Sequence, residues 1–177
     1  VGGEIFSSSL SLVEDGNGVG MPFDMEGTPT QRTVLVERGA VRSWLYDTYA
    51  ATRDNRLSTG NYFRGSSGEA PSIRPRCLFF EAGAETQAEL FQKMGEGVYW
   101  EFLDVLEPLP QDENRFFMRG RGWRVMGGQC TEPVSGIESI VDILRLFRGA
   151  AAVSKEVEFF SGFGSPSIFI EEMPLGS

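Results

Sequence analysis

The alternation of apolar and polar positions predicts β-strands in the first part of the chain. Apolar residues alternate with serines between residues 3 and 13, which is the period of two expected of a half-buried strand. Two β-rich runs, Thr33–Glu37 and Val41–Tyr46, flank a short break that contains Gly39. We therefore predict that these two runs pair as an antiparallel hairpin.

Further apolar runs predict strands in the rest of the chain. Residues 58–76 are rich in glycine, serine, proline and arginine, so we predict a long loop there. Two adjacent glycines, Gly127 and Gly128, predict a turn between two of the later strands. The predicted strands are Cys77–Glu81, Val98–Leu103, Arg115–Met118, Trp123–Met126, Gln129–Val134, Glu156–Phe160 and Ser167–Glu171.

Three segments carry signals for short helices. Asp47 can cap one helix, and a Thr-x-x-Glu capping box begins another at Thr86, which should stop at Gly95. A second capping box at residues 135–138 precedes apolar residues with helical spacing, so we predict a helix from there to Gly149. Its apolar face would consist of Ile137, Ile140, Val141, Leu144 and Phe147. With roughly eight strands and two or three helices, the predicted class is α+β, mainly β, with an antiparallel sheet.

Composition limits the size of the fold and its chemistry. A chain of 177 residues with 41% hydrophobic residues fits one domain with an ordinary core. It contains no histidine, which excludes Ser-His-Asp and Cys-His nucleophiles and imidazole zinc ligands. Its two cysteines, Cys77 and Cys130, lie too far apart for a Cys-x-x-Cys motif. No apolar run is long enough to span a membrane, so we expect a cytoplasmic location.

The charge is acidic overall but uneven along the chain. A net charge of −9 argues against direct nucleic-acid binding, which normally needs a basic face. The positive charge is almost all arginine, and many of the arginines lie before residue 77. Because guanidinium groups suit carboxylates and peptide carbonyls, this half could meet an acidic partner. The alternative is that these are surface arginines that reflect composition alone.

Asp24 and Glu26 form a carboxylate pair two residues apart, followed by Gly27. In an extended segment such a pair points the same way and could perform acid-base chemistry or help to hold a hard cation. The interpretation that we prefer is structural. Asp24 would form an Asx-type turn, and Glu26 would pair with an arginine such as Arg32.

Residues 58–61, Ser-Thr-Gly-Asn, form a small polar loop whose hydroxyls could bind a peptide or a carboxylate. Such a tetrapeptide more often only closes a turn. The neighbouring sequence is rich in aromatic residues, which protein interfaces use, although a hairpin can carry such residues on its two faces without binding anything. These aromatic residues are Trp44, Tyr46, Tyr49, Tyr62 and Phe63.

Two strings carry a family resemblance: Phe-Asp-x-Glu-Gly-x-x-Thr-Gln at residues 23–31 and Ser-Thr-Gly-Asn at residues 58–61. Together they resemble the C-terminal domain of the TldD/PmbA proteins, which are described as metallopeptidases and as modulators of DNA gyrase. The resemblance reaches nearly the whole chain. The candidate residues for peptide contact, partner contact or a structural motif are Phe23, Asp24, Glu26, Gly27, Thr30, Gln31, Tyr46, Ser58, Thr59, Gly60 and Asn61.

The resemblance implies that residues 1–177 are one C-terminal domain of a longer protein, with a preceding α/β domain. It implies a strongly twisted, barrel-like sheet, and a dimer between whose subunits an unfolded peptide is threaded. In the catalytic subunits a His-Glu-x-x-x-His helix and a late cysteine hold zinc. The region of that cysteine corresponds to residues 156–162, which contain none. The chain therefore resembles the non-catalytic PmbA-type (TldE) subunit.

We therefore expect a homo- or heterodimer with a subunit of the same family, in which this domain contributes dimer interface and a groove for unfolded peptide. We expect no catalytic residue, metal ligand or cofactor in this chain, and zinc only in a catalytic TldD-type partner. The alternative is a protein-interaction module that regulates DNA gyrase or another enzyme and has no peptidase role. A His-Glu-x-x-x-His helix in the upstream sequence would instead make the parent protein catalytic.

Overall fold

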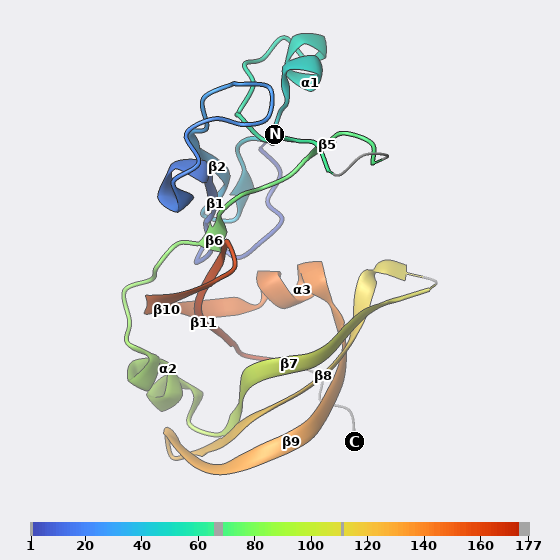
Figure 1. The fold of residues 1–177 in the computed structure, drawn as a ribbon. Helices are drawn as coiled ribbons and strands as arrows, with labels where there is room; N and C mark the ends of the chain where they lie inside the picture. The colour runs from blue at the N-terminus through green and yellow to red at the C-terminus, as the bar shows by residue number, and fades with distance from the viewer. Residues whose placement is uncertain (1, 66–68, 111, 174–177) are drawn as a thin grey trace. The chain divides into compact units, whose positions relative to one another are not determined.

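The computed structural model describes residues 2–65, 69–110 and 112–173. Over these residues the chain is mainly β, with three short α-helices and with mixed and antiparallel sheets (Figure 1). The chain consists of two compact units, each with most of its residue contacts inside itself. The first unit consists of residues 1–4, 11–81 and 157–165, and the second of residues 5–10, 82–156 and 166–177. The predicted mainly β class is confirmed.

The largest sheet has the strand order β10-β11-β6-β1-β2-β3. Its pairs are antiparallel from β6 to β3, whereas β11 runs parallel to β6. The predicted hairpin is confirmed by the pairing of Val36 with Val41, but its second strand is shorter than predicted. The Arg42 N–H still donates to the Leu35 carbonyl (2.8 Å), and the Ser43 N–H points to that same carbonyl (3.4 Å), so the regular ladder stops there. The strands near the N-terminus are β1 (Leu12–Asp15), β2 (Arg32–Glu37), β3 (Ala40–Val41) and β6 (Leu78–Phe80).

The strand predicted for residues 3–13 is wrong for most of its length, because β1 begins only at Leu12. Residues 5–10 belong to the second unit, where the Ser7 N–H donates to the Phe147 carbonyl (3.0 Å) and the Ser9 hydroxyl donates to the Ala150 carbonyl (2.9 Å). These are isolated contacts, not a ladder. Alternating serines resemble a half-buried strand in sequence, yet here they place short polar side chains against backbone carbonyls.

The first two predicted helices are confirmed. Helix α1 (Thr48–Arg53) is capped by the Asp47 carboxylate, which accepts from the Ala50 N–H (2.7 Å). Helix α2 (Gln87–Met94) has the complete capping box of Thr86 and Glu89, and it ends at Gly95. In each helix the capping side chain accepts one of the first backbone N–H groups, which have no partner within the helix.

Three long strands form the second unit's antiparallel sheet, in the order β7-β8-β9 (Figure 1). The strands predicted in this region are therefore pieces of longer ones. Strand β8 continues through Gly122, which lies outside the predicted strands. Next to a β-bulge in β7, the Tyr99 carbonyl comes within 1.8 Å of the position that a Cβ of residue 122 would take. Only glycine fits there. The strands are β7 (Gly97–Leu109), β8 (Asp112–Met126) and β9 (Gln129–Asp142).

The helix predicted from residue 135 to Gly149 is wrong over its first half. Residues 129–142 are strand β9, and helix α3 (Ile143–Arg148) begins only after Asp142, whose carboxylate accepts from the Arg145 N–H (2.8 Å). Apolar residues in this segment satisfy a helical period and, in part, a period of two. Pairing with β8 along nearly the whole of β9 decides between them, as tertiary context often overrides local propensity.

The remaining strands complete the two units. Two short strands lie inside the predicted loop of residues 58–76, and the two predicted C-terminal strands are confirmed in longer form. No sheet closes on itself over the described residues, so the barrel-like expectation is not met. These strands are β4 (Tyr62–Phe63), β5 (Ser72–Ile73), β10 (Ala150–Phe160) and β11 (Phe163–Ile170).

Candidate functional site

Asp24 anchors the motif of residues 23–31. Its side chain is buried, and one carboxylate oxygen accepts the N–H groups of Glu26 and Thr28, both at 2.9 Å. The other oxygen accepts from the Tyr62 N–H (3.1 Å). Asp24 therefore forms the expected Asx-type turn and ties that turn to β4. All three donors are backbone groups, so this carboxylate fixes loop geometry.

Glu26 has a different partner from the one expected. Its Oε2 atom accepts from the N–H of Thr48, the first residue of helix α1, at 2.9 Å. Arg32 instead pairs with Glu81, so the predicted Glu26–Arg32 ion pair is wrong. A carboxylate at a helix N-terminus is favourable because it meets unpaired N–H groups. Glu26 therefore joins the motif to helix α1.

The rest of the first string holds a tight hairpin around residue 27. The Thr30 hydroxyl is buried and donates to the Met21 carbonyl (2.6 Å), while the Thr30 N–H donates to the Pro22 carbonyl (3.0 Å). Phe23 forms an isolated antiparallel bridge with Pro29 and is 57% exposed. Gly27 has a positive φ at the turn, and Gln31 is exposed just before β2.

The Ser-Thr-Gly-Asn loop closes on Tyr46. The Thr59 hydroxyl accepts from the Tyr46 N–H (2.7 Å), and the hydroxyls of both Ser58 and Thr59 lie within hydrogen-bond distance of the Tyr46 carbonyl. Gly60 has φ +74°, and a Cβ there would lie 2.5 Å from the Pro29 carbonyl oxygen. The loop therefore packs directly on the first string, and the turn-closing interpretation agrees with this geometry.

Asn61 leads to a buried acidic residue that the sequence interpretation missed. Asn61 is 1% exposed, and its amide donates to the Arg74 carbonyl (3.3 Å). It also hydrogen-bonds Glu14, which is fully buried on β1 and accepts from the Arg76 N–H (3.1 Å). Burial raises the pKa of Glu14 despite these hydrogen bonds. The only sequence signal was an acidic residue directly after the apolar pair at positions 12 and 13.

The two strings of the motif thus form one framework, held by side-chain bonds to backbone groups. Its polar groups are largely engaged inside it, whereas its outer surface carries exposed apolar side chains. We find no arrangement here of a nucleophile with an adjacent base. The framework therefore suits a surface of fixed shape more than bond chemistry.

The described residues do not fit a zinc centre. They contain no group of three or more histidine, cysteine, aspartate or glutamate side chains arranged to hold a metal ion. Burial raises the pKa of the Cys77 thiol, and it does the same for Cys130, where the Glu101 carboxylate adds to the effect. Both shifts disfavour the thiolate form that zinc binds.

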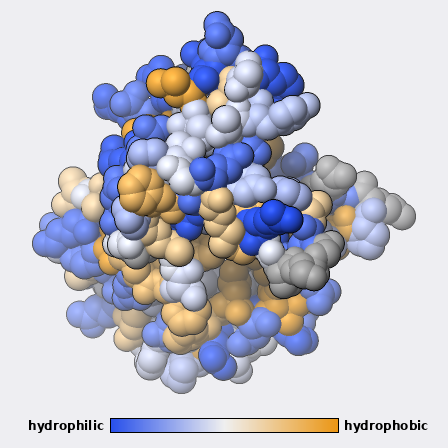
Figure 2. All heavy atoms as spheres, turned by 45° about the horizontal axis from the view of Figure 1, so that its top comes forward, coloured by the Kyte–Doolittle hydropathy of each residue, from blue (hydrophilic) through white to orange (hydrophobic). Residues whose placement is uncertain are grey.

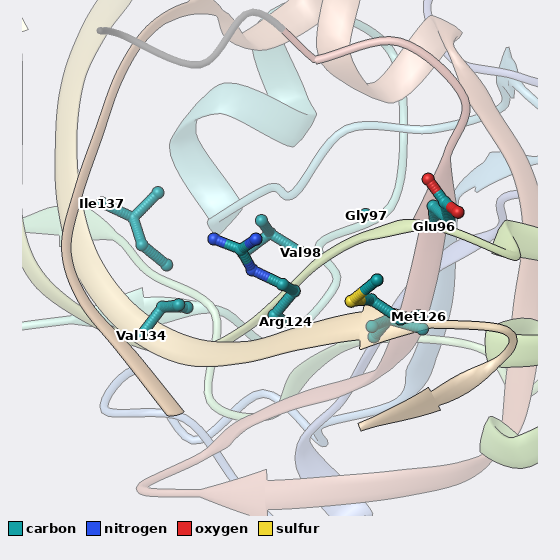
Figure 3. A pocket seen from close by; sticks show the side chains of 8 residues that line it. Glu96, Gly97, Val98, Arg124, Met126, Val134 and Ile137 are labelled. Carbon is teal, nitrogen blue, oxygen red and sulfur yellow. The ribbon is translucent and has the colours of Figure 1, made fainter. Parts of the chain in front are cut away.

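A second feature is an apolar hollow on the β7–β8–β9 sheet, of about 290 Å³. Figure 3 shows the side chains of Val98, Arg124, Val134 and Ile137 directed into the same space from three strands. Arg124 also pairs with Glu132 (2.9 Å) on β9. The hollow lies within the second unit and combines apolar walls with two charged side chains of opposite sign, Arg124 and Glu96.

Comparison with known proteins identifies the family. A family model described as the PmbA/TldA metallopeptidase C-terminal domain matches residues 1–177. The chain belongs to the PmbA/TldD family. A metalloprotease TldD homologue of Haemophilus influenzae is 24% identical over 194 residues, which cover 99% of this chain and 40% of that protein. Metalloprotease PmbA of Escherichia coli O157:H7 is 27% identical over 158 residues, which cover 87% of this chain and 32% of that protein.

Solved structures show the same PmbA/TldD fold. TldE from Thermococcus kodakarensis superposes with a TM-score of 0.88 at 22% identity, covering 100% of this chain and 42% of that one. A Thermotoga maritima protein, described as a candidate modulator of a DNA gyrase, superposes with a TM-score of 0.82 at 24% identity. The match covers 99% of this chain and 41% of that one. The chain therefore spans about two fifths of the length of these relatives. Over its described residues, no helix is long and apolar enough to cross a membrane.

Proposed function

We propose that this chain is the C-terminal domain of a PmbA/TldE-like subunit in a metallopeptidase complex. In this role it contributes dimer interface and a groove for unfolded peptide, and it performs no bond chemistry itself. The family match over residues 1–177 supports the assignment to a metallopeptidase family. The lack of a cysteine at residues 156–162 supports the non-catalytic role, because the family resemblance places a zinc-binding cysteine of the catalytic subunits in that region.

We infer the groove from the two outer edges of the β7–β8–β9 sheet. Strands β7 and β9 are 13 and 14 residues long, and neither pairs with another strand besides β8 over the described residues. An extended peptide can add to such an edge through backbone hydrogen bonds, with little demand on its sequence. The adjacent hollow would accept apolar side chains of the peptide.

The chemistry would belong to a catalytic TldD-type partner subunit. Zinc bound there would polarise the scissile carbonyl and lower the pKa of a bound water. The residues of this chain would hold the substrate extended and oriented, which lowers the entropic part of the barrier. The proposal includes both a homodimer and a heterodimer of subunits of this family.

The test uses the full-length parent protein, alone and mixed with a subunit that carries the His-Glu-x-x-x-His helix and the late cysteine. We expect cleavage of a disordered peptide by the mixture and none by the parent alone. Val134→Lys, which places a charge in the hollow, should slow cleavage by the mixture about tenfold. Gln129→Lys, on the same strand but outside the hollow, is the matched control. Chelator-insensitive cleavage by the parent alone would contradict the proposal.

A second candidate function is regulation of DNA gyrase or another enzyme by protein binding. The observation that favours it is the description of the Thermotoga maritima protein, whose fold this chain shares. An acidic domain suits contact with a protein better than contact with duplex DNA. Supercoiling by gyrase, measured with and without the parent protein, separates this function from the first: a dose-dependent change without any peptide cleavage would favour regulation.

A further inference from the structure

Three large apolar side chains stand at alternate positions in the first unit: Met21, Phe23 and Met25. They are 47%, 57% and 55% exposed. Phe23 lies in an isolated bridge and Met25 lies in the turn of residues 24–27, so their exposure, and not the alternation of a strand, places them at the surface. Asp24, between two of them, is directed inward and buried. We call these three residues the Met-Phe-Met row. On the face that Figure 2 presents, apolar side chains likewise reach the surface among polar ones.

The row is held in place by the framework beneath it. The carbonyl of Met21 accepts the Thr30 hydroxyl, and the N–H of Met25 donates to the Tyr62 carbonyl (3.4 Å). The hairpin bonds around Asp24 fix the residues between them. A rigid backbone loses little conformational freedom on binding, and methionine side chains can adapt to differently shaped partners.

Arginines lie at both ends of the row. The Arg76 guanidinium donates to the Met21 sulfur (3.2 Å), and the backbone N–H of Arg64 lies 3.2 Å from the Met25 sulfur. Neither guanidinium forms an ion pair with a carboxylate in the described part of the chain. The nearby acidic side chains are already engaged, since Asp24 and Glu26 accept backbone N–H groups.

The local charge is opposite to that of the whole chain. Residues 62–76 contain three arginines and one acidic residue, Glu69, so their formal charge is +2 on a chain of net charge −9. Arg74 lies over the Phe63 ring, 4.5 Å from its centroid, which leaves its edge available to a carboxylate. The row therefore combines exposed apolar side chains with two arginines that form no ion pair among the described residues.

We propose that the Met-Phe-Met row binds an extended acidic segment of a partner polypeptide. Apolar side chains of the segment, at alternate positions, would contact the row, and carboxylates between them would bind Arg64 and Arg76. A duplex nucleic acid does not fit, because most of this chain's surface charge would repel it. This surface lies in the first unit, and the proposal holds whether or not the chain serves a peptidase.

The test measures binding of a fluorescent peptide of alternating leucine and glutamate to the full-length parent protein. We expect saturable binding that weakens as salt is added, and at least tenfold weaker binding of a leucine–lysine peptide. Arg64→Glu and Phe23→Gln should each weaken binding of the acidic peptide at least tenfold. Both positions are exposed, so these variants should fold. Met25→Gln tests the same row if one of them does not fold.

Two matched controls remove the same kinds of group outside the row. Arg56→Glu makes the same charge change, and Leu57→Gln removes an apolar side chain that is 87% exposed. Both should bind the acidic peptide as the wild type does. Wild-type binding by Arg64→Glu and Phe23→Gln would overturn the proposal, and so would equal binding of the leucine–lysine peptide. Loss of a parent homodimer in Phe23→Gln, seen by sedimentation velocity, would also overturn it by assigning the row to a second copy.

Discussion

Glu14 offers a sharp test of the energetics of the framework. This residue is fully buried on β1, and its Oε1 atom accepts the N–H of Arg76 at 3.1 Å. The Oδ1 atom of the adjacent Asn61 is buried without a donor among the described residues. The hydrogen bond between Asn61 and Glu14 therefore runs from the Asn61 amide group to the carboxylate, which can only accept. The amide of Glu14→Gln still accepts from Arg76 through its oxygen and removes the buried charge.

The expected gain follows from these contacts. Removing a desolvated charge while keeping the Arg76 hydrogen bond should stabilise the protein by about 1–2 kcal/mol near pH 8. Glu14→Ala is the opposing variant. It leaves the Arg76 N–H without its acceptor and opens a cavity, so it should cost about 2–4 kcal/mol.

The pH dependence gives an independent readout. Burial raises the pKa of Glu14 above the ordinary value of 4.5, so the folded state keeps this proton at pH values where the unfolded chain has released it. The contribution of this group to stability is therefore full below pH 4.5 and is lost as pH rises through the folded pKa. Urea unfolding at a series of pH values should show the advantage of Glu14→Gln shrinking on acidification. A variant less stable than wild type at every pH would refute this reasoning.

Three further predictions concern the same chain. Asp24→Asn should lower the free energy of unfolding in urea by about 1 kcal/mol, because its amide group cannot accept all three N–H groups. Cleavage by the subunit mixture should stay intact. Loss of cleavage at full stability would indicate a chemical role for Asp24. Gly60→Ala should cost at least about 2 kcal/mol, since its Cβ would meet the Pro29 carbonyl. The control Gly20→Ala, at a left-handed position with open surroundings, should cost about 1 kcal/mol, and equal costs would contradict the close packing. Elemental analysis of chelator-free protein should find no stoichiometric zinc on this chain, and one tightly held zinc per chain would overturn the non-catalytic assignment.

The two capping boxes show which parts of the fold the sequence could predict. Thr86 and Glu89 begin a helix as predicted, because the cap, the apolar face and the terminal glycine all lie within a dozen or so residues of one another. The similar signal at residues 135–138 lies inside β9, where Ser135 pairs with Arg121 on β8. Pairing along the length of two long strands outweighs a local preference of a few tenths of a kcal/mol per residue.

The candidate site shows the same division. The Asx-type turn at Asp24 could be predicted because its bonds reach only two and four residues along the chain. The partner of Glu26 could not be predicted from the sequence. Arg32 pairs with Glu81 instead, and Thr48, whose N–H Glu26 accepts, lies 22 positions further along the chain. Glu14 was missed for a related reason: its partners come from residues 61 and 76, which only the folded chain brings to β1.

The parallel pairing of β11 with β6 has a consequence for how the protein folds. Phe163 pairs with Leu78, so this edge of β6 stays unpaired until β11, which is far along the sequence, has been synthesised. Closing so long a loop is entropically costly, and parallel pairings between distant strands form slowly. Until β11 arrives, β6 presents an open edge next to Phe79 and Phe80, which is a template for pairing with another copy. The interval between these two strands is therefore when a nascent chain is most exposed to aggregation.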